Sequence, residues 1–397
     1  MENGTIDLAE QLNDEFTQAI LPVTIIVGIE VVFGFVGNLL VIYVFLFHYR
    51  VCTFRYFVLC LAFIDITCCI TTMSGEVVTQ LYWYVYPVRE LCKIKSFFNV
   101  FTVTAEALCL VTIALDRYRK VCRPFGWQLK PRVAIYLCVI YYIIALCVAL
   151  PTPFFWGLHS ETKIYRNTSI TVILCEKDEA FMQTDYPMGY ISSVGAIISV
   201  LLVLMFVQYV FVAIKLLKER QQRMKSGKPT TKTSSSTAST SHCTIATSGI
   251  RSTENTRSND SAISVCDDKT DEIVTSAAFI ESDIRTDKKE TIHSEKPKKT
   301  KTRKQRATKR EVAIRVRRNT LIMFILTLTF IVTTVLYFVL ITFIASSKNI
   351  LQYLSDGQKA VYFFFLRLYF INHIINPAVY GLLDPQFQSA LRKIKKK

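Results

Sequence analysis

The sequence predicts an all-α membrane protein, a bundle of seven transmembrane helices followed by a short amphipathic eighth helix. Hydrophobic residues make up 51% of the 397-residue chain, and its mean hydropathy is +0.32. Charged residues avoid long stretches of the sequence, whereas helices in soluble cores are shorter and keep a polar stripe. Basic residues gather in alternate connections between those stretches. These observations exclude a soluble globular enzyme.

Seven stretches of the sequence are long enough to cross a bilayer. The hydrocarbon core is about 30 Å thick, which corresponds to about 20 apolar residues in a helix. Three of the stretches lack Asp, Glu, Lys and Arg altogether, and the other four contain one or two such residues each. With their polar ends included, the predicted helices cover residues 22–48, 56–82, 92–122, 131–154, 187–217, 313–345 and 359–383.

An odd number of spans places the two ends of the chain on opposite sides of the membrane. Residues 1–49 contain no Lys or Arg, whereas basic residues crowd the connections at 117–132 and 215–318. By the positive-inside rule those connections are cytoplasmic, so we expect a plasma-membrane protein with its N-terminus outside. The net charge of +16 favours contact with anionic membrane lipid or an acidic partner, and no motif indicates nucleic-acid binding.

The chain is expected to divide into five parts. Few aromatic residues and dense charge predict a disordered loop, although Lys215–Arg223 and Lys309–Arg318 are expected to extend the neighbouring helices. Apolar and basic faces after the seventh span predict a helix lying on the inner leaflet. In order, the parts are an extracellular tail (1–21), helices 1–5 (22–217), the cytoplasmic loop (218–312), helices 6–7 (313–383) and the amphipathic helix with a basic tail (384–397).

Cysteine positions predict one disulfide. Of the 12 cysteines, only Cys92 and Cys175 fall at extracellular positions, and disulfides persist on the oxidising side of a membrane. Two free thiols at these positions are the less favoured alternative. Asn3 and Asn167 begin glycosylation sequons on the same expected outer face.

Carboxylate and amide side chains occur inside the predicted spans, where charged groups are costly and usually functional. Asp65 and Glu106 lie in the second and third spans, and Asn38, Asn372 and Asn376 lie in the first and seventh. If the bundle brings them together, the two carboxylates cannot both stay ionised cheaply, so they share either a cation or a proton. An ordinary interhelical hydrogen-bond network is the alternative.

Two short motifs lie at the expected cytoplasmic ends of the third and seventh spans. In Asp116-Arg117-Tyr118, the carboxylate can hold the arginine and release it, although a snorkelling arginine is the more usual explanation of such a tripeptide. Asn376-Pro377-Ala378-Val379-Tyr380 is the stronger signal, because proline breaks the helical hydrogen-bond ladder and the Asn and Tyr side chains can bond the freed groups. This second motif predicts a hinge.

The order of these features resembles the rhodopsin-like (class A) G-protein-coupled receptors. The resemblance covers everything except the N-terminal tail and the long loop. It implies a seven-helix bundle that binds a ligand from outside and engages a heterotrimeric G protein and arrestin inside. The matching features are Gly37-Asn38, Leu61 to Asp65, Cys92, Asp116-Arg117-Tyr118, Cys175, and Asn376 to Tyr380 followed by Phe387.

The resemblance also implies roles at the cytoplasmic end. Arg117 would reach the G protein, with Asp116 as its resting partner. Tyr209 and Tyr380 match two tyrosines that meet in active states of the family. Val316 stands where many members carry an acid that holds the arginine, so a full resting lock is not expected here.

The resemblance further implies an ion site inside the bundle. Asp65, Asn372 and Asn376 match the family's internal sodium site. Glu106 stands where the family usually has serine, a departure that could strengthen or replace the site. No other cofactor is expected. We expect the two acids to share a proton slightly more readily than a sodium ion, because the extra carboxylate makes the site more negative.

The ligand class is narrowed by two positions and one loop. Asn99 stands where amine receptors carry aspartate, and Phe370 stands where opsins carry the retinal-binding lysine, so both classes are disfavoured. The long and mixed-charge segment Ser160–Asp185 suits a peptide better than a lipid. A neuropeptide receptor is therefore the preferred hypothesis, with a receptor for a small non-amine ligand as the alternative.

A third charged position completes the expected pocket. Arg367 in the seventh span needs an acidic partner because an unpaired guanidinium in a membrane is costly. Glu76 would border a ligand pocket, whereas Glu30 would make a purely structural bridge, and both partners remain open. Remote alternatives are a transporter and an intramembrane protease that would use Asp65 with Glu106, but neither explains the receptor-like motifs, so no enzyme is expected.

Overall fold

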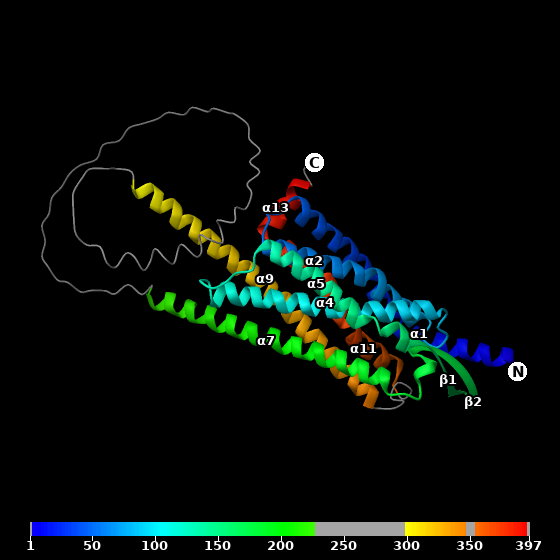
Figure 1. Cartoon of the computed structure of the whole chain (residues 1–397). Helices are drawn as coiled ribbons and strands as arrows, with labels where there is room; N and C mark the ends of the chain where they lie inside the picture. The colour runs from blue at the N-terminus through cyan, green and yellow to red at the C-terminus, as the bar shows by residue number, and fades with distance from the viewer. Residues whose placement is uncertain (1, 227–297, 347–353, 395–397) are drawn as a thin grey trace, which may run out of the picture.

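The structure is a computed structural model, and it describes residues 2–226, 298–346 and 354–394. Long helices lie side by side in one elongated bundle, and the N-terminus lies beside a two-stranded hairpin at one end (Figure 1). The helices are α1 (Glu2–Phe47), α2 (Thr53–Cys68), η1 (Cys69–Met73), α3 (Ser74–Leu81), α4 (Arg89–Cys122), α5 (Pro131–Ala149), α6 (Thr152–Phe155), η2 (Glu179–Phe181), α7 (Tyr186–Ser226), α9 (Lys298–Ser346), α11 (Asp356–Arg367), η3 (Leu368–Phe370), α12 (Ile371–Leu383) and α13 (Pro385–Ile394).

Seven spans make up the bundle. Among the described residues, six helical segments are long and apolar enough to cross a membrane: α1, α2 continued through η1 and α3, α4, α5 continued into α6, α7, and α9. The seventh span consists of α11 and α12, which the short 3-10 turn η3 joins. The predicted all-α, multi-pass bundle is confirmed, and α13 is the expected short eighth helix.

The first helix is longer than its apolar stretch. It was expected to begin near residue 22, but α1 begins at Glu2, so the N-terminal tail is helical. The Asn13 amide donates to the Leu81 carbonyl at 3.0 Å, and the Tyr84 backbone amide donates to Asn13 Oδ1 at 3.1 Å. The buried ring of Phe16 has its centroid 5.4 Å from that of Tyr84. Contacts with a neighbouring loop therefore stabilise turns that a polar composition does not predict.

The helices on either side of the long loop also extend beyond their apolar parts. The fifth span continues as α7 to Ser226, and α9 begins at Lys298, well before the expected start at residue 313. The basic segments on both sides of the loop are thus helical, as predicted. The helical extension before the sixth span is longer than expected. The central part of the loop, with its Ser- and Thr-rich run at 230–241, lies outside the described residues.

A β-hairpin forms the connection between the fourth and fifth spans. Strand β1 (Trp156–Tyr165) pairs with β2 (Thr168–Lys177) in antiparallel register. Alternate residues of β2 are buried, namely Ile170, Val172 and Leu174, because successive side chains of a strand point to opposite faces. The apolar face of the hairpin therefore packs onto the helices, although the sequence predicted only a loop here.

The tip of the hairpin reaches the outer turns of α1. Arg166 and Asn167 have φ values of 48° and 66°, as two-residue hairpin turns require, and asparagine tolerates this conformation better than most residues. The Tyr165 hydroxyl donates to Glu15 Oε1 at 2.7 Å, and Arg166 Nη2 lies 2.7 Å from the same oxygen. Next to this face, burial raises the pKa of Tyr84 to about 12, so its hydroxyl stays neutral.

Close helix contact at the hinge motif depends on one glycine. An added Cβ at Gly37 would lie 2.7 Å from Cγ of Pro377, so only glycine lets α1 approach α12 at this level. Beyond this contact, the buried rings of Phe45 and Tyr380 have centroids 5.5 Å apart. The first and seventh spans are therefore packed directly against each other around the proline.

Candidate functional site

A buried acid–histidine cluster lies inside the bundle. It consists of Asp65 on α2, Glu106 on α4 and His373 on α12, and all three side chains are buried. The Nδ1 atom of His373 lies 2.9 Å from Asp65 Oδ1, and its Nε2 atom lies 3.9 Å from Glu106 Oε2. One potential ligand atom of each residue lies within 4.8 Å of the others. The fold thus brings together the two predicted carboxylates and adds an imidazole.

Three asparagines surround this cluster, and each one has a different partner. Asn376 Nδ2 donates to the α2 carboxylate at 2.5 Å. Asn38 Nδ2 donates to the backbone carbonyl of His373 at 2.7 Å and so joins α1 to α12. Asn372 Nδ2 donates instead to Thr333 Oγ1 on α9 at 2.9 Å. The predicted polar floor is present, but Asn372 is bonded to α9 rather than to the carboxylate it was expected to accompany.

The contacts of Asp65 show whether the implied sodium ion fits. Hard cations take oxygen ligands, and Asp65 would have to offer its oxygens to the ion. Both oxygens already face nitrogen atoms, one from His373 and one from Asn376. The imidazole of His373 bonds one carboxylate and faces the other, so a ring nitrogen lies where an all-oxygen sodium site would need a ligand oxygen. The arrangement therefore does not fit a sodium ion.

The opposite end of the bundle from the hairpin contains the arginine motif. Arg117 and Asp116 form a buried ion pair, with 3% and 1% of their side chains exposed. Lys120 Nζ, one turn further along α4, lies 3.2 Å from Asp116 Oδ1. The pairing that the sequence motif suggested is therefore present, with a second cation on the same carboxylate.

One residue beyond the position of the missing acid, α9 makes a different ion pair. Val316 is half-buried and cannot pair with an arginine. Its neighbour Arg317 places Nη2 at 3.2 Å from Glu219 Oε2 on α7, and both side chains are partly exposed. This bridge ties the extended parts of the fifth and sixth spans to each other rather than to α4.

Tyr209 and Tyr380 have separate surroundings. The Tyr209 hydroxyl accepts a hydrogen bond from Thr327 Oγ1 on α9 at 3.3 Å. The buried hydroxyl of Tyr380 has no hydrogen-bond partner among the described residues, and its ring lies 6.3 Å, centroid to centroid, from that of Phe387 on α13. Together with the Arg117 pair, this is the arrangement that the resemblance assigns to a resting state.

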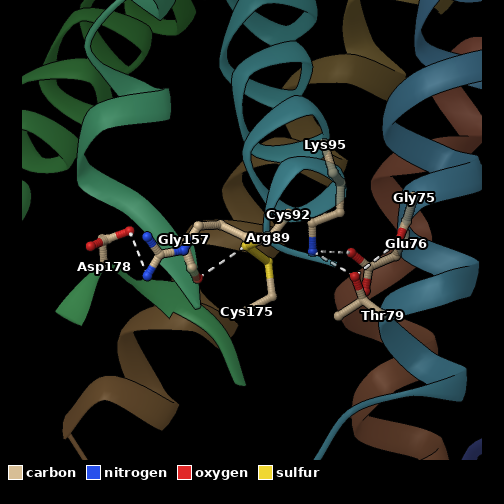
Figure 2. Close-up of a disulfide and its surroundings, with 9 residues drawn as sticks. All are labelled: Gly75, Glu76, Thr79, Arg89, Cys92, Lys95, Gly157, Cys175 and Asp178. Carbon is tan, nitrogen blue, oxygen red and sulfur yellow. Dashed lines mark hydrogen bonds and ion pairs between the residues drawn. A yellow bond between two sulfur atoms is a disulfide. The ribbon is translucent and has the colours of Figure 1, made fainter. Parts of the chain in front are cut away.

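Figure 2 shows the disulfide that holds the hairpin against the helices. Cys92 on α4 is bonded to Cys175 on β2, with a Cα–Cα distance of 5.6 Å, which confirms the predicted pairing. An added Cβ at Gly157 of β1 would lie 2.0 Å from Asp178 Oδ2, so glycine here leaves room for the Asp178 carboxylate beside this junction. Of the two predicted glycosylation sites, Asn167 is exposed at the hairpin tip. The end marked by the bond is called the disulfide end below.

Three charged side chains meet close to the disulfide. Glu76 on α3 pairs with Arg367 at the end of α11, which confirms the expected pairing and selects Glu76 over Glu30. Lys95, one turn after Cys92 on α4, places Nζ at 3.5 Å from Glu76 Oε2 and donates to Thr79 Oγ1 at 2.8 Å (Figure 2). We call Glu76, Lys95 and Arg367 the charge triad.

A glycine on α3 makes room for the lysine. An added Cβ at Gly75 would lie 2.7 Å from Cγ and 2.9 Å from Cβ of Lys95, so the lysine stem lies directly against the helix. Only 14% of the Lys95 side chain remains exposed. The fold thus buries the aliphatic part of the lysine and delivers its ammonium group to Glu76.

A cavity opens between α4, α7, α9 and η3, next to the charge triad. Its walls are mainly apolar and aromatic, and the predicted pocket residue Asn99 is one of its few polar groups. Such a mixture is typical of binding sites for organic ligands. Three aromatic residues, Tyr337, Phe338 and Tyr369, contribute to the same walls.

Sequence reasoning missed two residues of these sites, His373 and Lys95. Both are ionisable groups within helices that span the bundle, and this signal alone marks such residues as candidates. His373 lies only one residue after Asn372 and three before Asn376, so it was hidden among the amides. Lys95 lies just outside the charge-poor stretch of the third span.

Comparison with known proteins identifies the family of this fold. The family model described as "7 transmembrane receptor (rhodopsin family)" matches residues 37–380. The crystal structure of squid rhodopsin superposes with a TM-score of 0.56 at 13% identity, over 97% of this chain and 86% of that chain. At this identity the superposition shows the fold alone.

Curated relatives match over shorter segments. A putative neuropeptide Y receptor 11 of Caenorhabditis elegans is 30% identical over 122 residues, which cover 30% of each protein. Nematocin receptor 2 of the same organism is 23% identical over 170 residues, which cover 41% of this chain and 43% of that protein. The chain thus matches less than half the length of these relatives.

Proposed function

Because the chain belongs to the rhodopsin family of seven-transmembrane receptors, we propose that it transmits an extracellular peptide signal to heterotrimeric G proteins. The family is one of receptors, so the protease and transporter alternatives are set aside. The acid–histidine cluster is then part of the receptor's internal packing rather than a catalytic pair.

The placement of functional groups along the bundle supports this proposal. The disulfide end has the features expected of an extracellular face, since disulfides persist there and Asn167 is exposed beside it. The opposite end contains the buried Asp116–Arg117 pair, and in the proposal the arginine is released to the G protein when the helices separate. We therefore propose a plasma-membrane receptor with its N-terminus outside.

The peptide class is the more specific part of the proposal. The observation that carries it is the similarity to a protein named as a putative neuropeptide Y receptor. The outer architecture agrees, because β1 and β2 form a folded wall over one side of the mouth and α1 extends along it. A peptide can lie against such a wall, whereas a lipid would enter between helices from the bilayer.

The test is a screen of synthetic peptide libraries on cells that display the receptor. Calcium and cyclic AMP would be recorded together, because the G-protein class is open. A hit is accepted if Arg117→Ala abolishes the signal while surface labelling stays unchanged. If no peptide acts but small non-amine metabolites do, the second function, a receptor for a small non-amine ligand, replaces the first.

We propose arrestin and inner-leaflet lipid as further partners. The loop is rich in Ser and Thr, so phosphorylated loop residues are the proposed arrestin site. Deleting residues 228–300 should abolish arrestin recruitment and leave G-protein coupling, since α7 and all but the first three residues of α9 remain. Retained recruitment would refute the loop assignment. For lipid, Arg392 and Lys393 on α13 supply the basic face.

A further inference from the structure

The charge triad contains one more cation than it has acids to match. Lys95 and Arg367 both pair with Glu76, and the side chains are 14%, 11% and 8% exposed, respectively. Within the described part of the chain, every ion pair of the two cations goes to this one carboxylate. A buried charge without a partner is costly, and most of all in a membrane protein. A structural bridge needs one acid and one base, so the second base is surplus to it.

The donor groups of the triad are also incompletely used. An ammonium group has three donors, and Lys95 directs two of them to Glu76 and Thr79. A guanidinium has five N–H donors, and the buried Nε of Arg367 has no hydrogen-bond partner among the described residues. The site is therefore short of both a negative charge and acceptor oxygens, and one carboxylate would supply both.

The triad adjoins the cavity. Lys95 lies one turn, about 6 Å along the helix axis, from the cavity residue Asn99. Arg367 ends α11 and precedes the cavity residue Tyr369 by two residues. The cations thus stand where the cavity approaches the disulfide end.

We propose that the ligand of this receptor carries a carboxylate, which binds Lys95 and competes with Glu76 for Arg367. This inference rests on the proposed function, because it specifies the chemistry of the peptide. The carboxylate comes either from the C-terminus of the peptide or from an Asp or Glu side chain. Apolar parts of the same peptide occupy the cavity beside Tyr337, Phe338 and Tyr369. Binding transfers Arg367 from a partner on α3 to the ligand and so loosens the link between the second and seventh spans.

The experiment compares three synthetic peptide libraries on surface-labelled receptor. One library has free C-termini, the second is amidated, and the third is amidated with Asn and Gln in place of Asp and Glu. Direct binding of fluorescent peptides and G-protein activation are both recorded. The variants are Lys95→Gln and Arg367→Gln, each of which leaves Glu76 one cationic partner and so preserves a neutral pair, and Glu76→Gln. Lys93→Gln on the same helix is the matched control, because Lys93 has no ion pair within the described residues.

The expected result has two opposite directions. Lys95→Gln and Arg367→Gln should each weaken the best acidic peptide about ten- to a hundredfold, the value of one or two charge-assisted hydrogen bonds, whereas Lys93→Gln changes nothing. Glu76→Gln should strengthen the same peptide severalfold, because it removes the competing carboxylate. A purely structural triad would lower surface labelling without moving the preference between acidic and neutral peptides.

Two other outcomes would reject either the carboxylate inference alone or the peptide-receptor proposal as well. If the neutral library supplies equally potent ligands and the triad variants leave potency unchanged, the carboxylate inference is wrong while the peptide receptor stands. If no member of any library binds or activates, the peptide proposal is wrong and the inference falls with it. The first and second libraries differ only at the C-terminus, so they decide which carboxylate is recognised.

Discussion

The Nδ1 atom of His373 lies 2.9 Å from Oδ1 of Asp65, and this contact joins α12 to α2 inside the bundle. The other ring nitrogen faces Glu106, so a side chain of the protein itself stands where the family resemblance suggested a shared ion. The seventh span thereby supplies a partner to acids on two other spans. The position of α12 therefore depends on the carboxylates of α2 and α4.

Replacing His373 with alanine should destabilise the receptor. The change leaves two buried carboxylates close together without the imidazole, and breaking a buried charged pair costs about 3–5 kcal/mol. Thermal unfolding of the purified protein in nanodiscs measures the loss. His48→Ala, at an exposed site near the end of α1, is the control and should leave the melting temperature unchanged. Equal melting temperatures for both variants would show that the histidine contact contributes nothing.

Sodium should have no effect on the wild-type receptor. Glu106→Ser alone should also leave it insensitive, because His373 and Asn376 still occupy both oxygens of Asp65. The double variant Glu106→Ser with His373→Ser should gain sodium sensitivity, since it frees one oxygen and adds two hydroxyls. Melting temperatures in sodium chloride and in choline chloride provide the measurement. A wild-type receptor that sodium stabilises would contradict the structural assignment.

Gly37→Ala should disturb the packing of α1 against the hinge. The new methyl group would lie 2.7 Å from the ring of Pro377, and overpacking of this kind costs about 1–3 kcal/mol. Gly28→Ala on the same helix is the matched control, because an added Cβ there has no atom within 4 Å. It should be neutral or stabilising by up to about 1 kcal/mol, from helix propensity. The order of the two melting temperatures tests the contact.

Loss of the disulfide should prevent ligand binding at the disulfide end without changing the Asp116–Arg117 pair at the opposite end of the bundle. Cys92→Ala frees Cys175, and removal of a native disulfide from a small domain costs about 2–5 kcal/mol. We expect reduced surface labelling and loss of peptide binding. Cys147→Ala, at an exposed free cysteine, is the control. A variant lacking Cys92 that binds peptide with wild-type affinity would show that the hairpin does not need its tether.

Asn167 should carry an N-linked glycan in animal cells. It lies at the exposed tip of the hairpin, in the sequon Asn167-Thr-Ser. Asn167→Gln should remove one glycan and so increase electrophoretic mobility relative to the wild type. Glycosidase should increase the mobility of the variant once more, because it removes the glycan expected on Asn3. An unchanged mobility would show that Asn167 carries no glycan, which would contradict the prediction and would be expected if the hairpin lay on the cytoplasmic side.

Much of this structure could be predicted from the sequence because membranes impose simple rules. Seven charge-poor stretches gave the spans, and sidedness left only Cys92 and Cys175 to pair. The cost of a buried guanidinium predicted an acid beside Arg367. In each case placing a charged or polar group in the membrane costs much free energy, and few residues can act as its partner.

Features that depend on local contacts between distant segments could not be predicted. The outer turns of α1 are helical because Asn13 and Phe16 meet a loop near Tyr84, which no pattern in residues 1–21 reveals. The hairpin was missed because the exposed apolar residue Ile173 obscured the alternation in β2, and because Glu161 and Lys163 make β1 polar. Lys95 joined the triad because Gly75, twenty residues earlier, admits its stem.

The length of α9 gives the receptor a lever arm. The charge-free part of α9 begins at Asn319, yet the helix starts at Lys298, so about 32 Å of helix precedes the charge-free part. A small tilt of α9 within the bilayer therefore gives a larger displacement of its turns near Lys298. Arg317 and Glu219 join α9 to α7 close to the start of the charge-free part, so the long outer turns of α9 lie beyond this bridge. The far end of α9 therefore moves further than its bilayer part for the same tilt, simply because the helix is long.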